Sequence, residues 1–141
     1  MRALGLDLGT KTLGIAISDK LGLIASTYKT ILFNEQVYDE LLEPIKEIVQ
    51  KENIDTIVLG FPKNMNNTIG PRATETLVFK DKLESFLEMK VILEDERWTS
   101  VQANNMMIKA DMSRKKRKKV VDKLAATFIL QAYLDKNRKG D

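Results

Sequence analysis

The sequence contains neither histidine nor cysteine, and these two absences limit its chemistry more than any other feature of its composition. Without these residues the chain cannot form a Ser-His-Asp triad, a cysteine nucleophile, a histidine general base or one of the usual zinc sites. An enzyme built from this sequence has to work with carboxylates, lysine, arginine, hydroxyl groups or backbone atoms. Because carboxylates are hard oxygen ligands, they favour Mg²⁺ or Mn²⁺ as a metal.

Long apolar runs are also missing. No stretch approaches the roughly 18 to 20 residues that a membrane-spanning helix needs, and the first residues lack the pattern of a signal peptide. Since there is no cysteine for a disulfide framework, we expect a cytoplasmic protein with no membrane partner. The 141 residues are 43% hydrophobic and 30% charged, which predicts one globular domain over residues 1–141.

Charge is distributed unevenly along the chain. Residues 114–141 contain ten Lys or Arg and three Asp or Glu, which gives this segment a net charge of +7. Residues 1–113 contain thirteen Lys or Arg and seventeen Asp or Glu, a net charge of −4. An acidic body with a basic C-terminal segment indicates a polyanionic partner that is contacted at one place.

The hydrophobic periodicity predicts three strands, a helix, a strand, a helix, a strand and two helices. The strands are expected over residues 2–8, 12–18, 23–32, 56–60 and 91–93, and the helices over about 35–52, 71–88, 100–110 and 119–137. Pro44 predicts a break, a kink or a helix start within the first helical pattern. A meander followed by β-α-β units indicates a mixed sheet with helices on its faces. RNase H-like domains have this order, and so does each half of the actin/hexokinase superfamily.

Asp7 is the first candidate site residue. Its strand carries leucines on one face, whereas Asp7 shares the other face with the small residues Ala3 and Gly5, which leave room around the carboxylate. A buried carboxylate is costly unless it binds a metal or a hydrogen-bond donor. Asp7 is therefore either a metal ligand or a cap for the turn that follows it, and the pattern gives both interpretations equal weight.

Further acids occur at two later positions. Asp95-Glu96-Arg97 follows the last predicted strand, at the end where open α/β sheets bind ligands, although a solvated salt bridge is the simpler explanation of that triplet alone. Asp122 falls within the apolar arc of the final helix, where a carboxylate needs a partner; a first-turn Asp favoured by the helix dipole is the alternative. Three acids on separate elements can converge to hold two divalent ions that catalyse phosphodiester hydrolysis.

Six consecutive cations precede Asp122 and would neutralise phosphates without reading bases. They are Arg114, Lys115, Lys116, Arg117, Lys118 and Lys119. We expect them in a loop before the final helix; a merely solvated loop or a nuclear-import tag are the alternatives. Their position immediately before Asp122 favours substrate binding. The polar loop over residues 64–72 is either a substrate-contact loop or a plain connection.

Four blocks of the sequence, in this order and spacing, resemble the YqgF/RuvX-like family. Its members are described as pre-16S rRNA nucleases and as Holliday-junction-resolvase-like proteins of the RNase H-like class. The blocks are Leu6-Asp7-Leu8-Gly9-Thr10-Lys11-Thr12-Leu13-Gly14-Ile15-Ala16, Gly60-Phe61-Pro62-Lys63-Asn64-Met65 with Gly70-Pro71-Arg72-Ala73, Asp95-Glu96-Arg97-Trp98-Thr99-Ser100, and Ser113 to Lys119 with Asp122-Lys123-Leu124-Ala125-Ala126. The sequence departs from the family at Asn66-Asn67 and Ile69, where Asp-Gly and a Glu are usual, and at Trp98, where a smaller aliphatic residue is usual.

The resemblance implies an α/β, RNase H-like fold: a mixed five-stranded sheet, with an antiparallel three-strand meander followed by parallel strands, and helices on both faces. It also implies catalytic, metal-binding acids at Asp7, Glu96 and Asp122, with Asp95 as the alternative for the middle position, and Mg²⁺ or Mn²⁺ as the cofactor. The implied function is maturation of the 5′ end of small-subunit ribosomal RNA in a bacterial cytoplasm.

We therefore expect a metal-dependent endonuclease on structured RNA, with precursor rRNA, free or in a ribosomal assembly intermediate, as the first choice of substrate. Lys11, Arg72, Arg97 and the six cations would position phosphates. Branched DNA is an alternative substrate, because phosphate contacts do not distinguish the two. The chain is expected to act as a monomer or a homodimer.

Two other functional classes stay open. The hairpin that begins at Asp7 resembles the phosphate-binding hairpin of the actin/hexokinase superfamily, but that ATP site needs two such domains and 141 residues supply one. A non-catalytic nucleic-acid-binding module, in which the acids are structural, would bind in EDTA and without Asp7.

Overall fold

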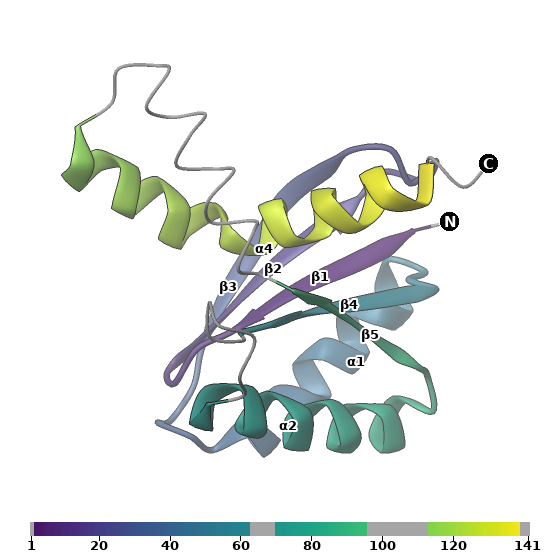
Figure 1. The fold of residues 1–141 in the computed structure, drawn as a ribbon. Helices are drawn as coiled ribbons and strands as arrows, with labels where there is room; N and C mark the ends of the chain where they lie inside the picture. Colours follow the sequence, from purple (N-terminus) through teal and green to yellow (C-terminus); the bar gives the residue numbers. More distant parts are fainter. Residues whose placement is uncertain (1, 63–69, 96–112, 139–141) are drawn as a thin grey trace.

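The computed structural model describes residues 2–62, 70–95 and 113–138, with the backbone alone described over residues 114–123 and at 138 (Figure 1). Within these ranges the elements follow the predicted order of strands and helices. They are β1 (Ala3–Leu8), β2 (Thr12–Ser18), β3 (Ala25–Leu32), the 3₁₀ helix η1 (Tyr38–Leu41), α1 (Leu42–Lys51), β4 (Thr56–Phe61), α2 (Pro71–Leu87), β5 (Val91–Asp95) and α4 (Arg114–Arg138).

The five strands form one mixed sheet in the order β3-β2-β1-β4-β5. The β1–β2 and β2–β3 pairs are antiparallel, whereas β1–β4 and β4–β5 are parallel. Helix α4 covers one face of the sheet, and α1 and α2 cover the other (Figure 1). The predicted meander, the parallel strands and the helices on both faces are therefore confirmed.

The two faces of the sheet carry side chains of different size. Leu4, Leu6 and Leu8 of β1 belong to the large core that packs under α1 and α2. The opposite face of the sheet carries smaller residues and packs against α4 in a second core, which consists of Ala3, Ala16, Ala25, Val58, Ala126, Ile129, Leu130 and Leu134. This alternation of large and small residues along β1 is the one predicted from its sequence.

Gly5 shows how closely α4 approaches the sheet. A Cβ atom at this position would lie 2.7 Å from the Cβ atom of Leu130 and 3.1 Å from the carbonyl oxygen of Ala126. Both distances are shorter than an ordinary van der Waals contact. Glycine at position 5 therefore lets α4 lie directly on the backbone of β1.

Several element boundaries differ from the prediction. The helix expected from residue 35 begins only at Leu42, after η1, because Gln36 has a positive φ of 61° that interrupts helical backbone. Pro44 lies in the first turn of α1, where its missing N–H is not needed, so it marks a helix start rather than a kink. Strand β5 continues two residues beyond the predicted end at residue 93, so Asp95 belongs to the strand instead of following it.

The prediction of a loop for the six cations is wrong, because α4 begins at Arg114 and their backbone is helical. Arginine and lysine are good helix formers, and no Gly or Pro occurs from residue 114 to residue 138. The helix expected over residues 100–110 lies outside the described residues. Among the helices described, none is long and apolar enough to cross a membrane.

Candidate functional site

Asp7 lies on the α4 face of β1, as its place in the sequence pattern predicts. It is half-buried and pairs across β2 with Gly14. A Cβ atom built on Gly14 would lie 3.7 Å from the Cβ atom of Asp7 and 3.6 Å from the Cβ atom of Ala126. The carboxylate-bearing residue of β1 is therefore next to α4 at the level of Ala126.

Glycines flank Asp7 on both neighbouring strands. Leu6 pairs with Leu59 in the parallel β1–β4 ladder, so the next pair of positions is Asp7 and Gly60. Gly60 in turn pairs with Glu94 of β5. Across the α4 face the strands thus present glycine, aspartate, glycine and glutamate in one row, and the two glycines leave space beside the Asp7 carboxylate.

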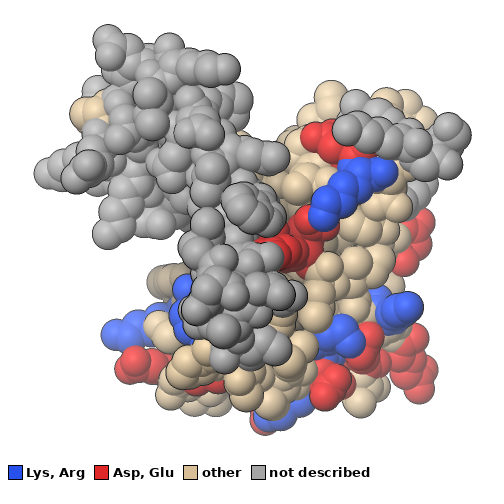
Figure 2. All heavy atoms as spheres, in the orientation of Figure 1, with Lys and Arg blue, Asp and Glu red and all other residues tan. Residues whose placement is uncertain are grey.

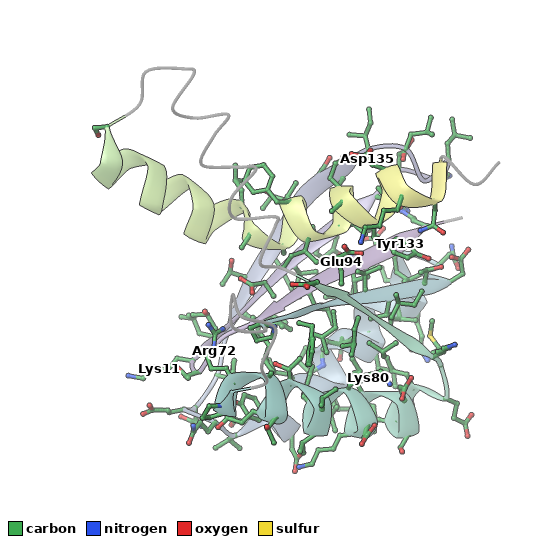
Figure 3. The ribbon with its side chains drawn as sticks, in the orientation of Figure 1. Lys11, Arg72, Lys80, Glu94, Tyr133 and Asp135 are labelled. Atoms are coloured by element: carbon green, nitrogen blue, oxygen red, sulfur yellow. The ribbon has the colours of Figure 1, made fainter. Side chains whose placement is uncertain are left out.

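Glu94 is a buried acid that the sequence analysis missed. Because strand residues alternate, Glu94 faces α4, while Val91 and Leu93 pack toward α1 and α2. Its exposed fraction is 5%, and the Lys136 ammonium of α4 lies 2.5 Å from Glu94 Oε2. Figure 3 shows Glu94 beneath α4, on the side of the helix that carries Tyr133. A carboxylate directly after three apolar strand residues was the signal that could have identified it.

Asp95 is the last residue of β5 and pairs with Phe61. By strand alternation it shares a face with Leu93, on the side of α1 and α2, and not with Glu94. Glu96 and Arg97, the other members of the predicted acidic triplet, lie outside the described residues. The structure therefore brings Asp7 and Glu94 to the same face of the sheet, and directs Asp95 to the other face.

Helix α4 carries the third predicted acid. Its buried residues are Ala126, Ile129, Leu130 and Leu134, whereas Ala125, Phe128 and Ala132, which the helical wheel put at the centre of the apolar face, are only half-buried. Asp122 is in α4 four residues before Ala126, which is about one helical turn. Its side chain lies outside the described residues. The backbone position of Asp122 is thus one turn from the residue that approaches Asp7.

Two exposed cations lie at the end of the sheet where β1 ends. Lys11 is in the turn between β1 and β2, and Arg72 is in the first turn of α2; Figure 3 shows both at this end of the molecule. The Arg72 guanidinium donates a hydrogen bond of 3.2 Å to the carbonyl oxygen of Leu8. Arg72 therefore contacts the backbone of the residue that follows Asp7.

The β1–β2 turn is held from the side of η1. Its Thr10 and Lys11 carbonyl oxygens accept hydrogen bonds from the backbone N–H groups of Gln36 and Phe33, each 2.9 Å long. The Tyr38 hydroxyl donates to Glu75 of α2 at 2.9 Å, and burial, followed by this hydrogen bond, raises the pKa of Tyr38. These contacts fix the turn against α2. No sequence motif pointed to them, because they join residues far apart in the chain.

The charged surface on the other side of the sheet is mixed. In Figure 2, acidic and basic side chains alternate over the layer of α1 and α2 at the bottom of the view. That part of the described surface is therefore not uniformly positive. The side chains of the six cations, Arg114 to Lys119, lie outside the described residues, and their helical backbone belongs to the layer on the α4 face.

The residue types on the α4 face fit a divalent metal. Carboxylate oxygens are the ligands that Mg²⁺ and Mn²⁺ prefer, and the glycines beside Asp7 leave space for an ion. Within the described ranges no group of three or more His, Cys, Asp or Glu residues is gathered. A complete ligand set around Asp7 would need acids whose side chains lie outside these ranges, as those of Glu96 and Asp122 do.

Comparisons with known proteins agree with the resemblance found in the sequence. A family model described as "RuvX: Holliday junction resolvase" matches residues 1–136. A Geobacillus sp. (strain WCH70) protein named "Putative pre-16S rRNA nuclease" is 54% identical over 135 residues, which cover 96% of this chain and 98% of the relative. A Bacillus subtilis (strain 168) protein of the same name is 53% identical over 135 residues, with the same coverage of both chains.

A solved structure described as "T. thermophilus RuvC in complex with Holliday junction substrate" matches with a TM-score of 0.67 and 14% sequence identity, covering 99% of this chain and 96% of that one. At this identity the likeness concerns the fold, and it confirms the predicted RNase H-like class. The family model and the relatives confirm the prediction of a nuclease, a hydrolase of phosphodiester bonds in nucleic acid. On the match over residues 1–136 and the identity above 50%, the chain belongs to the RuvX family.

Proposed function

We propose that this protein is a metal-dependent endonuclease that processes the 5′ end of precursor small-subunit rRNA. The names of the two relatives support this choice of substrate. The structural observation that carries the proposal is the environment of Asp7. This half-buried carboxylate has glycine on both neighbouring strands and lies beside the helix that contains Asp122 and the six cations.

In this proposal Asp7, Glu96 and Asp122 bind Mg²⁺ or Mn²⁺. When bound, the metal supplies an activated water and stabilises the charge on the leaving oxygen of the phosphodiester. We assign the middle position to Glu96 and not to Asp95, because Asp95 shares a face of β5 with Leu93. The half-buried position of Asp7 on a regular strand keeps its carboxylate in one orientation, which favours a fixed ligand geometry.

The cations of the chain hold the substrate in this proposal. A cluster of carboxylates repels phosphates, so an RNA chain approaches the site only where positive charge compensates. Lys11 and Arg72 lie at the end of β1, and the six cations from Arg114 to Lys119 precede Asp122 on α4, with Arg97 as a further phosphate contact. These contacts would position the backbone of any nucleic acid without reading its sequence.

Branched DNA is the second candidate substrate, and the description of the family model as a Holliday junction resolvase favours it. The same acids and the same phosphate contacts would serve both reactions. A resolvase has to cut two strands of a junction in concert, so this alternative also requires a homodimer, whereas an RNA endonuclease can act as a monomer.

The test compares wild-type protein with Asp7→Asn and Asp95→Asn on precursor small-subunit rRNA, free and in assembled particles, with Mn²⁺ or with EDTA, and maps the RNA ends. We expect cleavage that needs Mn²⁺ and is lost in Asp7→Asn. Asp95→Asn is the matched control: it removes a charge from the adjacent segment and should still cleave. RNA binding by Asp7→Asn should be intact or tighter, because repulsion of the phosphates decreases.

Each alternative result has a clear meaning. Cleavage in EDTA, or by Asp7→Asn, would contradict the metal site. If wild-type protein leaves every RNA substrate intact but cuts a branched DNA, the resolvase function replaces the rRNA function. If it binds both nucleic acids and cuts neither, the protein is a binding module.

A further inference from the structure

The ion pair between Glu94 and Lys136 is the strongest feature of the molecule that the proposed nuclease site does not use. Glu94 is the next-to-last residue of β5, and its side chain is 5% exposed. It is the one acidic residue among the buried residues of the described ranges. Lys136 lies near the end of α4 and approaches Glu94 from the solvent side, with 66% of its own side chain exposed. The pair therefore covers a buried carboxylate with a lysine.

A purely stabilising role explains this pair poorly. Removing a carboxylate from water is costly, and an ion pair with it often repays no more than that cost. An apolar residue at position 94 would pack against α4 as Ile129 and Leu130 pack against the sheet. A buried ion pair is better explained where the exact arrangement of two elements matters, and the positions of β5 and α4 are what this pair joins.

The arrangement of β5 against α4 is weakly defined by apolar packing. Strand β5 is at the edge of the sheet and pairs with β4 alone. Helix α4 makes most of its contacts with β1, β2 and β3, and fewest with β5. A charge-assisted hydrogen bond of 2.5 Å from Lys136 Nζ to Glu94 Oε2 is therefore a direct restraint between the end of β5 and α4.

Both elements joined by the pair lead to proposed metal ligands. Glu96 follows β5 two residues after Glu94, and Asp122 is in α4 with Lys136. In the same row of the sheet, Gly60 separates Glu94 from the position beside Asp7. We propose that Glu94 and Lys136 form a positioning pair that holds the end of β5 against α4 and so sets the separation of the metal-binding carboxylates. This proposal rests on the proposed function.

The main test is Lys136→Met, which keeps the length of the side chain and removes the charge. The dissociation constant of Mn²⁺ is measured from the electron paramagnetic resonance signal of the free ion, and RNA cleavage is followed against Mn²⁺ concentration. We expect Mn²⁺ to bind about tenfold more weakly, since partners that orient metal ligands have effects of that order. The Mn²⁺ concentration for half-maximal cleavage should rise by the same factor.

Three further variants separate positioning from stability. Lys136→Arg keeps the charge at the end of α4 and should restore Mn²⁺ binding toward that of the wild type. Glu94→Gln leaves no uncompensated buried charge, so it should fold even if Lys136→Met does not, and it should also weaken Mn²⁺ binding. Lys80→Met breaks a 3.0 Å pair with Glu84 on α2, in the other layer, and should lower stability without changing Mn²⁺ binding.

The outcomes distinguish the two proposals. If wild-type protein binds Mn²⁺ and Asp7→Asn does not, but Lys136→Met and Glu94→Gln bind it as tightly as the wild type or more tightly, the positioning pair is wrong and the nuclease site stands. If the wild type binds no Mn²⁺, both proposals are wrong. If Lys80→Met weakens Mn²⁺ binding as much as Lys136→Met does, the effect is one of general stability and the positioning role is refuted.

Discussion

Gly5→Ala should destabilise the protein, although alanine is usually the more favourable residue. Gly5 has no positive φ, so alanine can adopt its backbone conformation. The new Cβ atom would lie 2.7 Å from the Leu130 Cβ atom and 3.1 Å from the Ala126 carbonyl oxygen. Neither atom can move by a side-chain rotation, because one is backbone and the other is bonded directly to it. The strand and α4 have to separate instead.

The expected magnitude follows from these distances. Carbon atoms pack at about 3.5 to 4.0 Å, so β1 and α4 have to move apart locally by about 1 Å. Overpacking of this kind costs about 1 to 3 kcal/mol. Alanine in place of glycine recovers about 0.4 to 1 kcal/mol by lowering the entropy of the unfolded chain. The net loss is about 1 to 2 kcal/mol, which corresponds to a decrease in Tm of roughly 3 to 8 °C for a domain of this size.

Urea unfolding followed by circular dichroism measures this loss, and Gly14→Ala is the matched control. Gly14 also lies on the α4 face of the sheet, but its Cβ atom would meet Ala126 and Asp7 at 3.6 and 3.7 Å, which are ordinary contacts. We expect this variant to stay within about 0.5 kcal/mol of the wild type. Equal stability of Gly5→Ala and the wild type, or a larger loss in Gly14→Ala, would refute the close approach of α4 to β1.

Three other perturbations test separate parts of the structure. The Val91 N–H lowers the pKa of the Glu84 carboxyl below 4.5, so Glu84 stabilises the fold above about pH 4.5 and this contribution is lost as the pH falls through the lower, folded pKa. Glu84→Gln should therefore flatten the acid branch of the stability profile, and an unchanged profile would contradict this. Tyr38→Phe, which removes the hydroxyl bonded to Glu75, should cost about 1 kcal/mol, so an unchanged urea midpoint would argue against the bond. Lysine-to-glutamine changes within residues 114–119 should lower the salt dependence of RNA affinity by about 0.7 to 0.9 in log–log slope per lost phosphate contact; an unchanged slope would exclude those lysines from the interface.

Local patterns in the sequence predicted the architecture well. The leucines at alternate positions of β1, with small residues between them, already distinguish a thick core on one face from a close helix on the other. The same pattern assigned Asp7 to the α4 face. The order of strands and helices then determined the mixed sheet, because a meander followed by β-α-β units leaves few other topologies.

Boundaries set by distant contacts could not be predicted in the same way. Strand β5 includes Glu94 and Asp95 because both pair with β4, and this pairing is not visible in the local sequence. The start of α4 was missed for another reason: a run of cations suggested a solvated loop, although the helix propensity of arginine and lysine favours the observed helix. The two errors moved the predicted site residues to loops, whereas the described ones lie on regular elements.

The position of the site follows from the asymmetry between the two faces of the sheet. Glycine at positions 5, 14 and 60 removes side chains from the α4 face around Asp7, so the helix lies close to the backbone and the carboxylates reach the remaining space. On the leucine-rich face the same strands bury large side chains and leave no such space. Stability and the site are therefore linked through α4: a change that moves this helix away from β1 moves Asp122 away from Asp7 while the larger core under α1 and α2 stays intact.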